Sequence, residues 1–286
     1  MLQNRATIRE VRMHLQREIS KHHPRGETDS LIRIIMEHCG FPFPAAILEP
    51  QQEPGAEIIA QIKEIVAEIH TGRPIQYILG TTTFCELNIK VNENVLIPRQ
   101  ETEEMVTRII ESRAHSFSRI MDLGTGSGCI ALALKRRFPE ADVTGLDASS
   151  QALEVAAENG RTNGLDVRWI LGDMLDPDAT GLRGACDLVV SNPPYVLTKE
   201  KAMINRNVLD FEPPGALFVE DHDPLKFYHA IARFASSNLT PGGTLWVEIN
   251  ERYGGGTARI FEQAGLSNVV IHKDIHEKER FVEATK

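Results

Sequence analysis

The chain has 286 residues, 42% of them hydrophobic, which is enough for one large α/β domain and a smaller second domain. Its 31 lysine and arginine residues against 40 aspartate and glutamate residues give a formal net charge of -9, which opposes nonspecific binding to phosphate backbones and favours a protein or small-molecule substrate. The four cysteines show no zinc-binding spacing, and no apolar run approaches the roughly 20 residues that span a bilayer. We therefore expect a cytoplasmic protein with reduced thiols, no metal site and no membrane or direct nucleic-acid partner.

Residues 1–79 are predicted to form a small helical domain. Apolar side chains recur at helical spacing over 8–19, 31–38 and 58–69. A bundle of fewer than about 80 residues has a thin core. Residues 1–79 contain none of the cofactor motifs of the later part of the chain, so we expect this helical domain to recognise the substrate.

A β-hairpin linker is predicted at 80–97. Apolar residues alternate over 84–91, polar turn formers follow at 92–94, and 95–97 are apolar again. We interpret the two apolar segments as paired strands that form a stiff connector. The next segment opens a helix with proline and acidic residues in its first turn, and Arg99 there either belongs to the helix start or contacts substrate or cofactor.

Strands and helices then alternate to the end of the chain. The predicted strands are 119–123, 142–147, 167–171, 186–191, 243–249, 267–273 and 279–284, and the predicted helices are 128–137, 149–163, 224–238 and 255–264. Such alternation is typical of a mostly parallel sheet with helices on both faces. The link 274–278 is too short for a crossover helix, so the last two strands must pair antiparallel. We predict for 98–286 an α/β, Rossmann-like class I methyltransferase sheet with one antiparallel edge strand.

A glycine-rich loop follows the first of these strands and opens a helix. Glycines permit positive φ and let a ligand approach the backbone closely near a helix N-terminus. The spacing Gly-x-Gly-x-Gly differs from the Gly-x-Gly-x-x-Gly of dinucleotide pyrophosphate sites, so a cofactor without phosphates fits better. The candidate cofactor-binding residues of this loop are Gly124, Thr125, Gly126, Ser127 and Gly128.

Two further strand ends carry candidate cofactor contacts. Asp147 ends the second strand, where its carboxylate can accept hydrogen bonds from both ribose hydroxyls; the alternative is a helix cap, a role that Ser149 can fill instead. After the third strand, Asp173 can accept from an adenine amine while Met174 lies against the ring, or the two form only a capped turn. These strand ends together describe S-adenosylmethionine, whose reactive end carries a sulfonium and an amino acid instead of phosphate.

The loop Asn192-Pro193-Pro194-Tyr195 follows the fourth strand, at the edge of the sheet where open α/β folds place their chemistry. Two consecutive prolines remove two backbone donors and fix two φ angles, so the loop presents carbonyl oxygens and the side-chain oxygen of Asn192. These acceptors suit a planar NH2 group. The alternative is an ordinary turn, because Asn-Pro and Pro-Pro are common turn sequences. We predict that Asn192 and the Pro193 carbonyl orient the substrate nitrogen while Tyr195 contacts the amide plane.

This loop resembles the signature of amino-methyltransferases that act on planar NH2 groups. Further segments, at 72–80, 97–103, 211–213 and 216–217, look like the bacterial peptide chain release factor N5-glutamine methyltransferases, and the resemblance covers nearly the whole chain. It implies S-adenosylmethionine-dependent methylation of the glutamine in the Gly-Gly-Gln motif of class 1 peptide chain release factors. It also implies that the glutamine binds at 192–195.

The resemblance also carries over cofactor contacts to individual residues. They are the five residues of the glycine loop, Asp147, Met174 and Asn192. The chain departs from the family at 219–225 and at Asn250, which we expect to lie away from the site motifs.

Three other functions remain open from the sequence. The chain could be a related ribosomal-protein glutamine methyltransferase or an adenine-N6 nucleic-acid methyltransferase, and the net charge argues against the latter. A catalytically silent cofactor-binding module in translation is the alternative outside enzymes, and the intact loop at 192–195 disfavours it.

Overall fold

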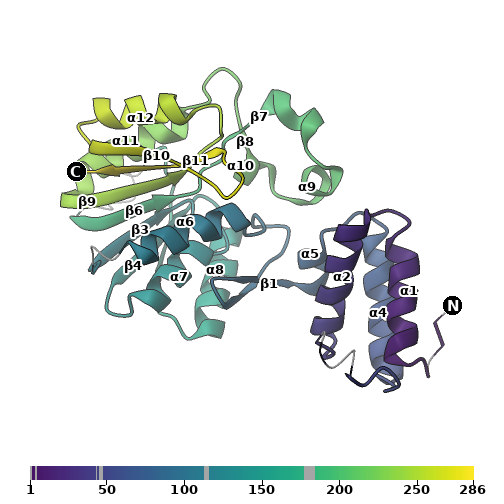
Figure 1. Ribbon diagram of the computed structural model, residues 1–286. Helices are drawn as coiled ribbons and strands as arrows, with labels where there is room; N and C mark the ends of the chain where they lie inside the picture. The colour runs from purple at the N-terminus through teal and green to yellow at the C-terminus, as the bar shows by residue number, and fades with distance from the viewer. Residues whose placement is uncertain (1, 4, 43, 45–47, 113–115, 177–183) are drawn as a thin grey trace. The chain divides into compact units, whose positions relative to one another are not determined.

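The computed structural model describes residues 2–3, 5–42, 44, 48–112, 116–176 and 184–286 (Figure 1). The chain divides into two compact units. The first comprises Met1–Gly80 with Arg206–Phe211, and the second comprises Thr81–Asn205 with Glu212–Lys286. In the described part of the chain, no helix is both long and apolar enough to cross a membrane.

The first unit is helical, as predicted. Its helices are α1 (Ile8–Ile19), α2 (Arg25–His38), α4 (Ala56–Ile69), α5 (Ile75–Leu79) and α9 (Arg206–Phe211). Helix α1 begins with a capping box: the Glu10 amide donates to the Thr7 hydroxyl at 3.3 Å, and the Thr7 amide donates to the Glu10 carboxylate at 2.8 Å. The apolar stripes of α1, α2 and α4 form one buried core, which explains the helical spacing in the sequence.

The hairpin differs from the prediction. Strands β1 (Thr81–Phe84) and β2 (Leu87–Lys90) pair antiparallel, and the turn lies at Cys85 and Glu86, both with positive φ. A turn is present at 92–94, where the Val95 amide donates to the Asn92 carbonyl at 3.1 Å, but it does not join two strands. The predicted second strand at 95–97 is therefore wrong.

Side chains from distant parts of the chain explain this difference. The backbone of Lys90 exchanges two hydrogen bonds with the Asn159 side chain, at 2.7 and 3.0 Å. The amide of Ile97 donates to the carboxylate of Glu212 at 3.2 Å. Asn159 thus satisfies backbone groups of β2 that do not bond to β1, and Glu212 satisfies the Ile97 amide without a partner strand.

The second unit is built around a seven-stranded sheet. Its strands are β3 (Arg119–Leu123), β4 (Asp142–Asp147), β5 (Arg168–Leu171), β6 (Cys186–Ser191), β9 (Leu239–Glu248), β10 (Ser267–Lys273) and β11 (Glu279–Thr285). Their order is β10-β11-β9-β6-β3-β4-β5, and all neighbours from β9 to β5 are parallel. The predicted strands and the mostly parallel sheet are confirmed.

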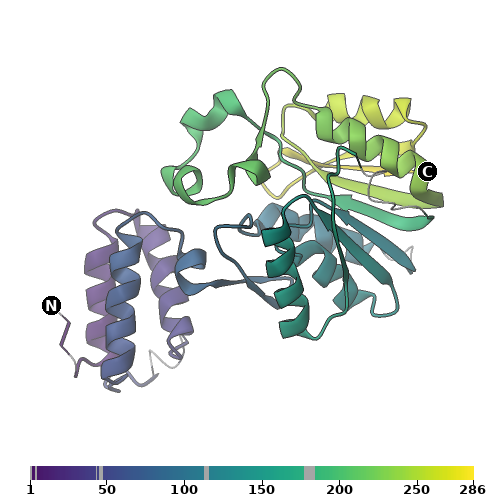
Figure 2. The ribbon, with the colours of Figure 1, turned by 180° about the vertical axis from the view of Figure 1, so that it is seen from behind.

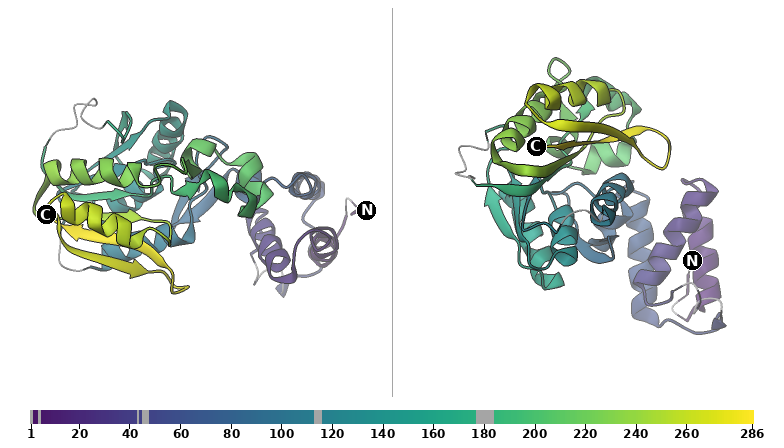
Figure 3. Two further views of the ribbon diagram at one scale, coloured as in Figure 1. Left: turned by 90° about the horizontal axis from the view of Figure 1, so that it is seen from above. Right: turned by 60° about the vertical axis from the view of Figure 1, so that its left-hand side comes forward.

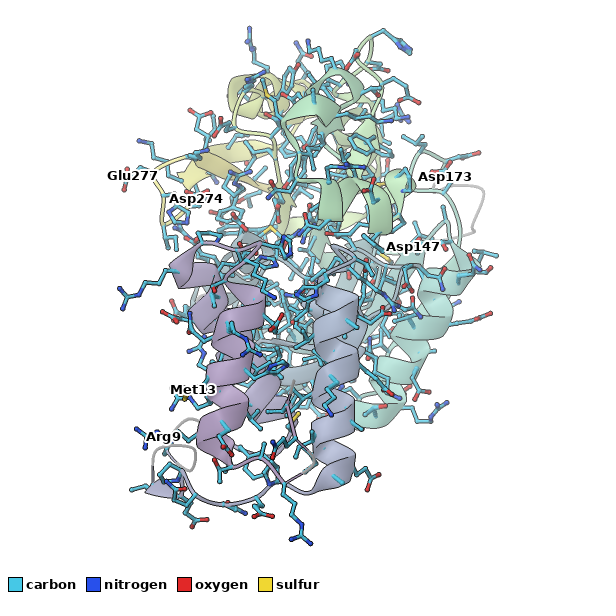
Figure 4. All side chains as sticks on the ribbon, turned by 90° about the vertical axis from the view of Figure 1, so that its right-hand side faces the viewer. Arg9, Met13, Asp147, Asp173, Asp274 and Glu277 are labelled. Atoms are coloured by element: carbon cyan, nitrogen blue, oxygen red, sulfur yellow. The ribbon has the colours of Figure 1, made fainter. Side chains whose placement is uncertain are left out.

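One detail of the sheet prediction is wrong. Strand β11 pairs antiparallel with both β9 and β10, so the antiparallel strand lies next to the edge, and β10 forms the edge (Figure 3). The link between β10 and β11 is a tight turn in which Asp274, labelled in Figure 4, accepts hydrogen bonds from the amides of His276 and Lys278. This turn reverses the chain, so that β11 runs back between β10 and β9.

Helices cover both faces of the sheet (Figures 1 and 2). On one face lie α6 (Gln100–Glu111), α7 (Cys129–Arg137) and α8 (Ser150–Asn163), and on the other lie α11 (Lys226–Asn238) and α12 (Gly254–Gln263). Short elements complete the unit, namely β7 (Val196–Leu197), η2 (Thr198–Met203), α10 (Pro214–Leu217) and β8 (Phe218–Val219). Because β3, β4, β5 and β6 are parallel, their carboxyl ends meet at one edge.

Candidate functional site

A cavity of about 510 Å³ lies in the second unit, at the carboxyl ends of the parallel strands. Its volume is in the range of small-molecule sites. Asp147 and Asp173 both line it and lie on the same side of this unit in Figure 4. The other predicted site residues in its described lining are Gly124, Thr125, Gly126, Ser127, Met174, Asn192 and Pro194. Gly128, Pro193 and Tyr195 are absent from that lining.

A wider depression of about 1240 Å³ lies in the first unit. Arg9 and Met13 of α1, labelled in Figure 4, are among its lining residues. None of the predicted site residues belongs to its described lining, so among these two cavities the predicted site lies at the smaller one.

The glycine loop between β3 and α7 needs its glycines for backbone geometry. Gly124, Gly126 and Gly128 have φ of 75°, 55° and 79°, in the left-handed region that side chains disfavour. A methyl group on Gly124 would collide with the terminal methyl of Met174, and one on Gly128 would lie 2.8 Å from the Trp169 ring. Beside Gly126 no protein atom lies within 4 Å of that position, so the loop has open space where it lines the cavity.

Asp147 holds this loop in place. One carboxylate oxygen accepts from the Gly126 amide at 2.8 Å, and the other accepts from the Ser149 amide at 2.9 Å. The N-cap of α8 is Ser149, whose hydroxyl accepts from the Ala152 amide, so the cap does not require Asp147. Burial raises the pKa of the Asp147 carboxyl, against the backbone hydrogen bonds of Ser149, Gly126 and Ala148 that lower it. Each oxygen keeps a lone pair for a ligand.

The end of β5 supplies the third contact. Asp173 is exposed, and its carboxylate accepts from the Leu175 amide at 2.8 Å, so the capped turn is present. Met174 is 9% exposed and contributes to the core of the sheet as well as to the cavity. The side chain of Met174 therefore forms an apolar wall beside the glycine loop.

Asn192 is anchored by a chain of hydrogen bonds that the sequence analysis missed. Its side-chain nitrogen donates to the Thr102 hydroxyl at 2.9 Å, and that hydroxyl donates to the Glu248 carboxylate at 2.6 Å. The Tyr195 hydroxyl donates to the other Glu248 oxygen at 2.8 Å. Thr102 and Glu248 are 3% and 0% exposed. The sequence did contain one signal for Glu248: it is a charged residue at the otherwise apolar end of a predicted buried strand.

The departure at Asn250 lies beside the loop, so the expectation that it is remote from the site is wrong. Its side-chain nitrogen donates to the Tyr195 carbonyl and to the Glu200 carboxylate, both at 3.3 Å. The side-chain amide of Asn250 therefore helps to fix the backbone of the loop at 192–195.

Arg99 forms an ion pair at the rim of the cavity. It donates to Glu212 at 2.6 Å, and Glu212 is 3% exposed. The second oxygen of Glu212 binds the amide of Ile97. Two segments that carried the family resemblance, 97–103 and 211–213, thus meet beside the cavity through this ion pair.

Comparison with known proteins agrees with this geometry. The profile of the methyltransferase small domain matches residues 102–219. A release factor glutamine methyltransferase of Flavobacterium psychrophilum is 42% identical over 78% of this chain and 79% of its own length. One of Bacteroides thetaiotaomicron is 41% identical over 79% of this chain and 81% of its own.

Solved structures show the same fold at low identity. A T. thermophilus 16S rRNA methyltransferase in complex with AdoMet and guanosine has a TM-score of 0.51 and 16% identity, with 72% of this chain and 49% of that chain covered. A methyltransferase of Pyrococcus furiosus has a TM-score of 0.50 and 19% identity, with 70% and 89% covered. The chain belongs to the family of release factor glutamine methyltransferases, which transfer a methyl group from S-adenosylmethionine.

Proposed function

We propose that this protein methylates the side-chain nitrogen N5 of the glutamine in the Gly-Gly-Gln motif of class 1 peptide chain release factors. The observation that carries this proposal is the anchoring of Asn192 through its amide nitrogen. That bond leaves the carbonyl oxygen of Asn192 as an acceptor in the cavity that also contains the glycine loop and Asp147.

The residues of the cavity fit S-adenosylmethionine. The open space beside Gly126 accepts a ligand against the backbone. Asp147 has two remaining acceptor positions for ribose hydroxyls, and the second carboxylate oxygen of Asp173 accepts from no backbone amide of the described residues. Met174 offers a flat apolar contact for the adenine. When bound, the cofactor supplies a methyl group on a sulfonium.

The role of the loop at 192–195 is to orient a poor nucleophile. The lone pair of a carboxamide nitrogen is delocalised into its carbonyl, so reaction requires a defined approach. The Asn192 side-chain oxygen and the Pro193 carbonyl each accept one N–H of the glutamine, and Tyr195 and Pro194 confine the amide plane. Orientation of this type contributes up to about 7–11 kcal/mol, against roughly 3–5 kcal/mol for a positioned base.

Proton release does not need a dedicated base. Among the described residues that line the cavity there is no histidine or lysine, and Arg99 is paired with Glu212. The proton that leaves the nitrogen after transfer goes to water. The protein therefore acts by binding and orientation.

The helical first unit serves to bind the release factor outside its glutamine loop. None of its residues belongs to the described lining of the cavity, so it is not needed for methyl transfer itself. A stable protein complex requires contacts on the order of 800 Å² per partner, more than one short loop provides.

The test is transfer of a labelled methyl group to purified release factors, with and without replacement of the Gly-Gly-Gln glutamine by alanine. Label on the unchanged factor alone is expected. Equal labelling of both factors would exclude the assigned target.

A second arm uses Asn192→Ala. It should keep cofactor affinity and lower the single-turnover rate by at least about 100-fold, because an oriented acceptor is lost and one substrate N–H is left unpaired. Asn88→Ala, at an exposed position in β2, is the matched control and should keep the normal rate. A near-normal rate for Asn192→Ala would refute its role.

A further inference from the structure

The buried carboxylate of Glu248 has no part in the mechanism described so far. It ends β9 with no exposed surface and accepts hydrogen bonds from two hydroxyls, those of Thr102 and Tyr195. Burying a carboxylate is costly unless hydrogen bonds compensate. Neighbours on three other elements also face this group: Arg280 from β11, Glu101 from α6, and Tyr228 from α11, whose hydroxyl donates to the Glu248 carbonyl at 3.2 Å.

The hydrogen-bond chain has a direction that Glu248 sets. An ionised carboxylate only accepts hydrogen bonds, so the single hydroxyl hydrogen of Thr102 must point to Glu248. The Thr102 oxygen then offers only lone pairs to Asn192. The side-chain nitrogen of Asn192 must face Thr102, and its oxygen is left for the ligand.

We propose that Glu248 is a positioning residue that orients the Asn192 amide through Thr102 and thereby makes the site selective for a carboxamide over a carboxylate. This inference rests on the proposed function, since Asn192 must meet the target glutamine. An oxygen facing the ligand requires a donor: the NH2 group of glutamine provides one, whereas the carboxylate of glutamate has none and is repelled. Sites built to accept a hydrogen bond discriminate strongly against analogues that lack the donor.

Protonation of Glu248 would remove this direction. A neutral carboxyl can donate to Thr102, which frees the Thr102 hydroxyl to donate to Asn192 and allows the amide to turn over. Burial raises the pKa of Glu248, while the hydrogen bonds from Thr102 and Tyr195 and the charge of Arg280 lower it. The orientation is therefore complete at pH above this pKa and is lost as the pH falls below it.

The experiment compares Thr102→Val, which removes the relay hydroxyl, with Thr102→Ser, which keeps it. The readout is the ratio of affinities for a release factor with the intact Gly-Gly-Gln and one with glutamate in place of that glutamine. Both are measured by calorimetry with demethylated cofactor, so no transfer occurs. We expect Thr102→Val to lower the preference for glutamine by about 10-fold or more, as loss of one hydrogen bond implies, and Thr102→Ser to retain it.

Glu248→Gln tests the origin of the direction. A glutamine at 248 can present either an acceptor or a donor to Thr102, so this variant should also lose preference. Combined with Thr102→Val it should add little, because both changes break the same relay. Additive losses, or an unchanged preference in both single variants at normal cofactor affinity, would overturn the inference.

A separate measurement distinguishes failure of this inference from failure of the proposed function. Wild-type protein that does not methylate the Gly-Gly-Gln glutamine refutes the proposed function. Wild-type protein that methylates it, together with a Thr102→Val variant of unchanged preference, refutes only the relay. If Glu248→Gln does not fold by circular dichroism, the comparison of the two Thr102 variants still decides.

Discussion

Asp147 should be the position where a small change weakens cofactor binding most clearly. Its two oxygens already accept from the backbone amides of Gly126 and Ser149 at 2.8 and 2.9 Å. A carboxylate has about four lone-pair positions, so two remain for ribose hydroxyls. Asp147→Asn keeps the shape but replaces one acceptor by an NH2 group. The NH2 group cannot accept a hydrogen bond, so it faces a backbone N–H as a second donor and no longer accepts from a ribose hydroxyl.

The magnitude follows from the charge of the lost acceptor. A hydrogen bond to a charged group contributes about 1.5–3 kcal/mol, so the Kd for S-adenosylmethionine should rise about 10- to 150-fold. Isothermal titration calorimetry measures this without a protein substrate. Because burial raises the pKa of Asp147 and the ionised form accepts the bonds, wild-type affinity should also fall as the pH is lowered towards that pKa.

Ser149→Ala is the matched control. It removes the N-cap bond of α8 and should cost about 1 kcal/mol of stability, yet it leaves both ribose acceptors in place. Its Kd should stay near that of the wild type while its melting temperature falls. If Asp147→Asn binds the cofactor within twofold of the wild type, Asp147 only organises the loop and the ribose assignment is refuted.

Two further predictions concern the glycine loop and the strand before it. Gly124→Ala should lower stability by about 1–2 kcal/mol because of its positive φ, and it should weaken cofactor binding because the added methyl displaces Met174. Gly255→Ala is the control, since its added methyl meets no atom within 4 Å, and it should leave the cofactor affinity measured by calorimetry unchanged. Equal cofactor affinities of the two variants would contradict the clash with Met174. Burial raises the pKa of Asp122 to about 7 in the folded protein, from the ordinary 3.8. The folded state therefore binds this proton more tightly than the unfolded state, and the resulting contribution to stability is full below pH 3.8 and is lost as the pH rises to about 7. Asp122→Asn should therefore remove about 2 kcal/mol of the stability change between pH 5 and 7, measured by urea unfolding at each pH; identical pH dependence in both proteins would refute this.

Local patterns in the sequence were sufficient for the architecture of the second unit. Apolar segments at strand spacing, separated by segments at helical spacing, identified every strand of the sheet. The strands β3, β4, β6 and β9 are mostly buried, and this burial selects their residues directly. Residues 124–127 of the glycine loop, together with Asn192 and Pro194, could be placed at the cavity because both loops follow parallel strands, whose carboxyl ends meet at one edge.

Only the tertiary structure decided which distant side chains meet. Thr102 and Glu248 are 146 positions apart, and Arg99 and Glu212 are 113 apart, so no local periodicity links them. The same reason explains the errors. The hairpin turn lies at Cys85 and Glu86, and the backbone after it bonds to Asn159 and Glu212. Strand β11 pairs with β9 as well as with β10. The spacing of apolar residues in a segment indicates which of its faces is buried. Hydrogen-bond partners and neighbouring strands depend instead on how all segments of the chain pack together.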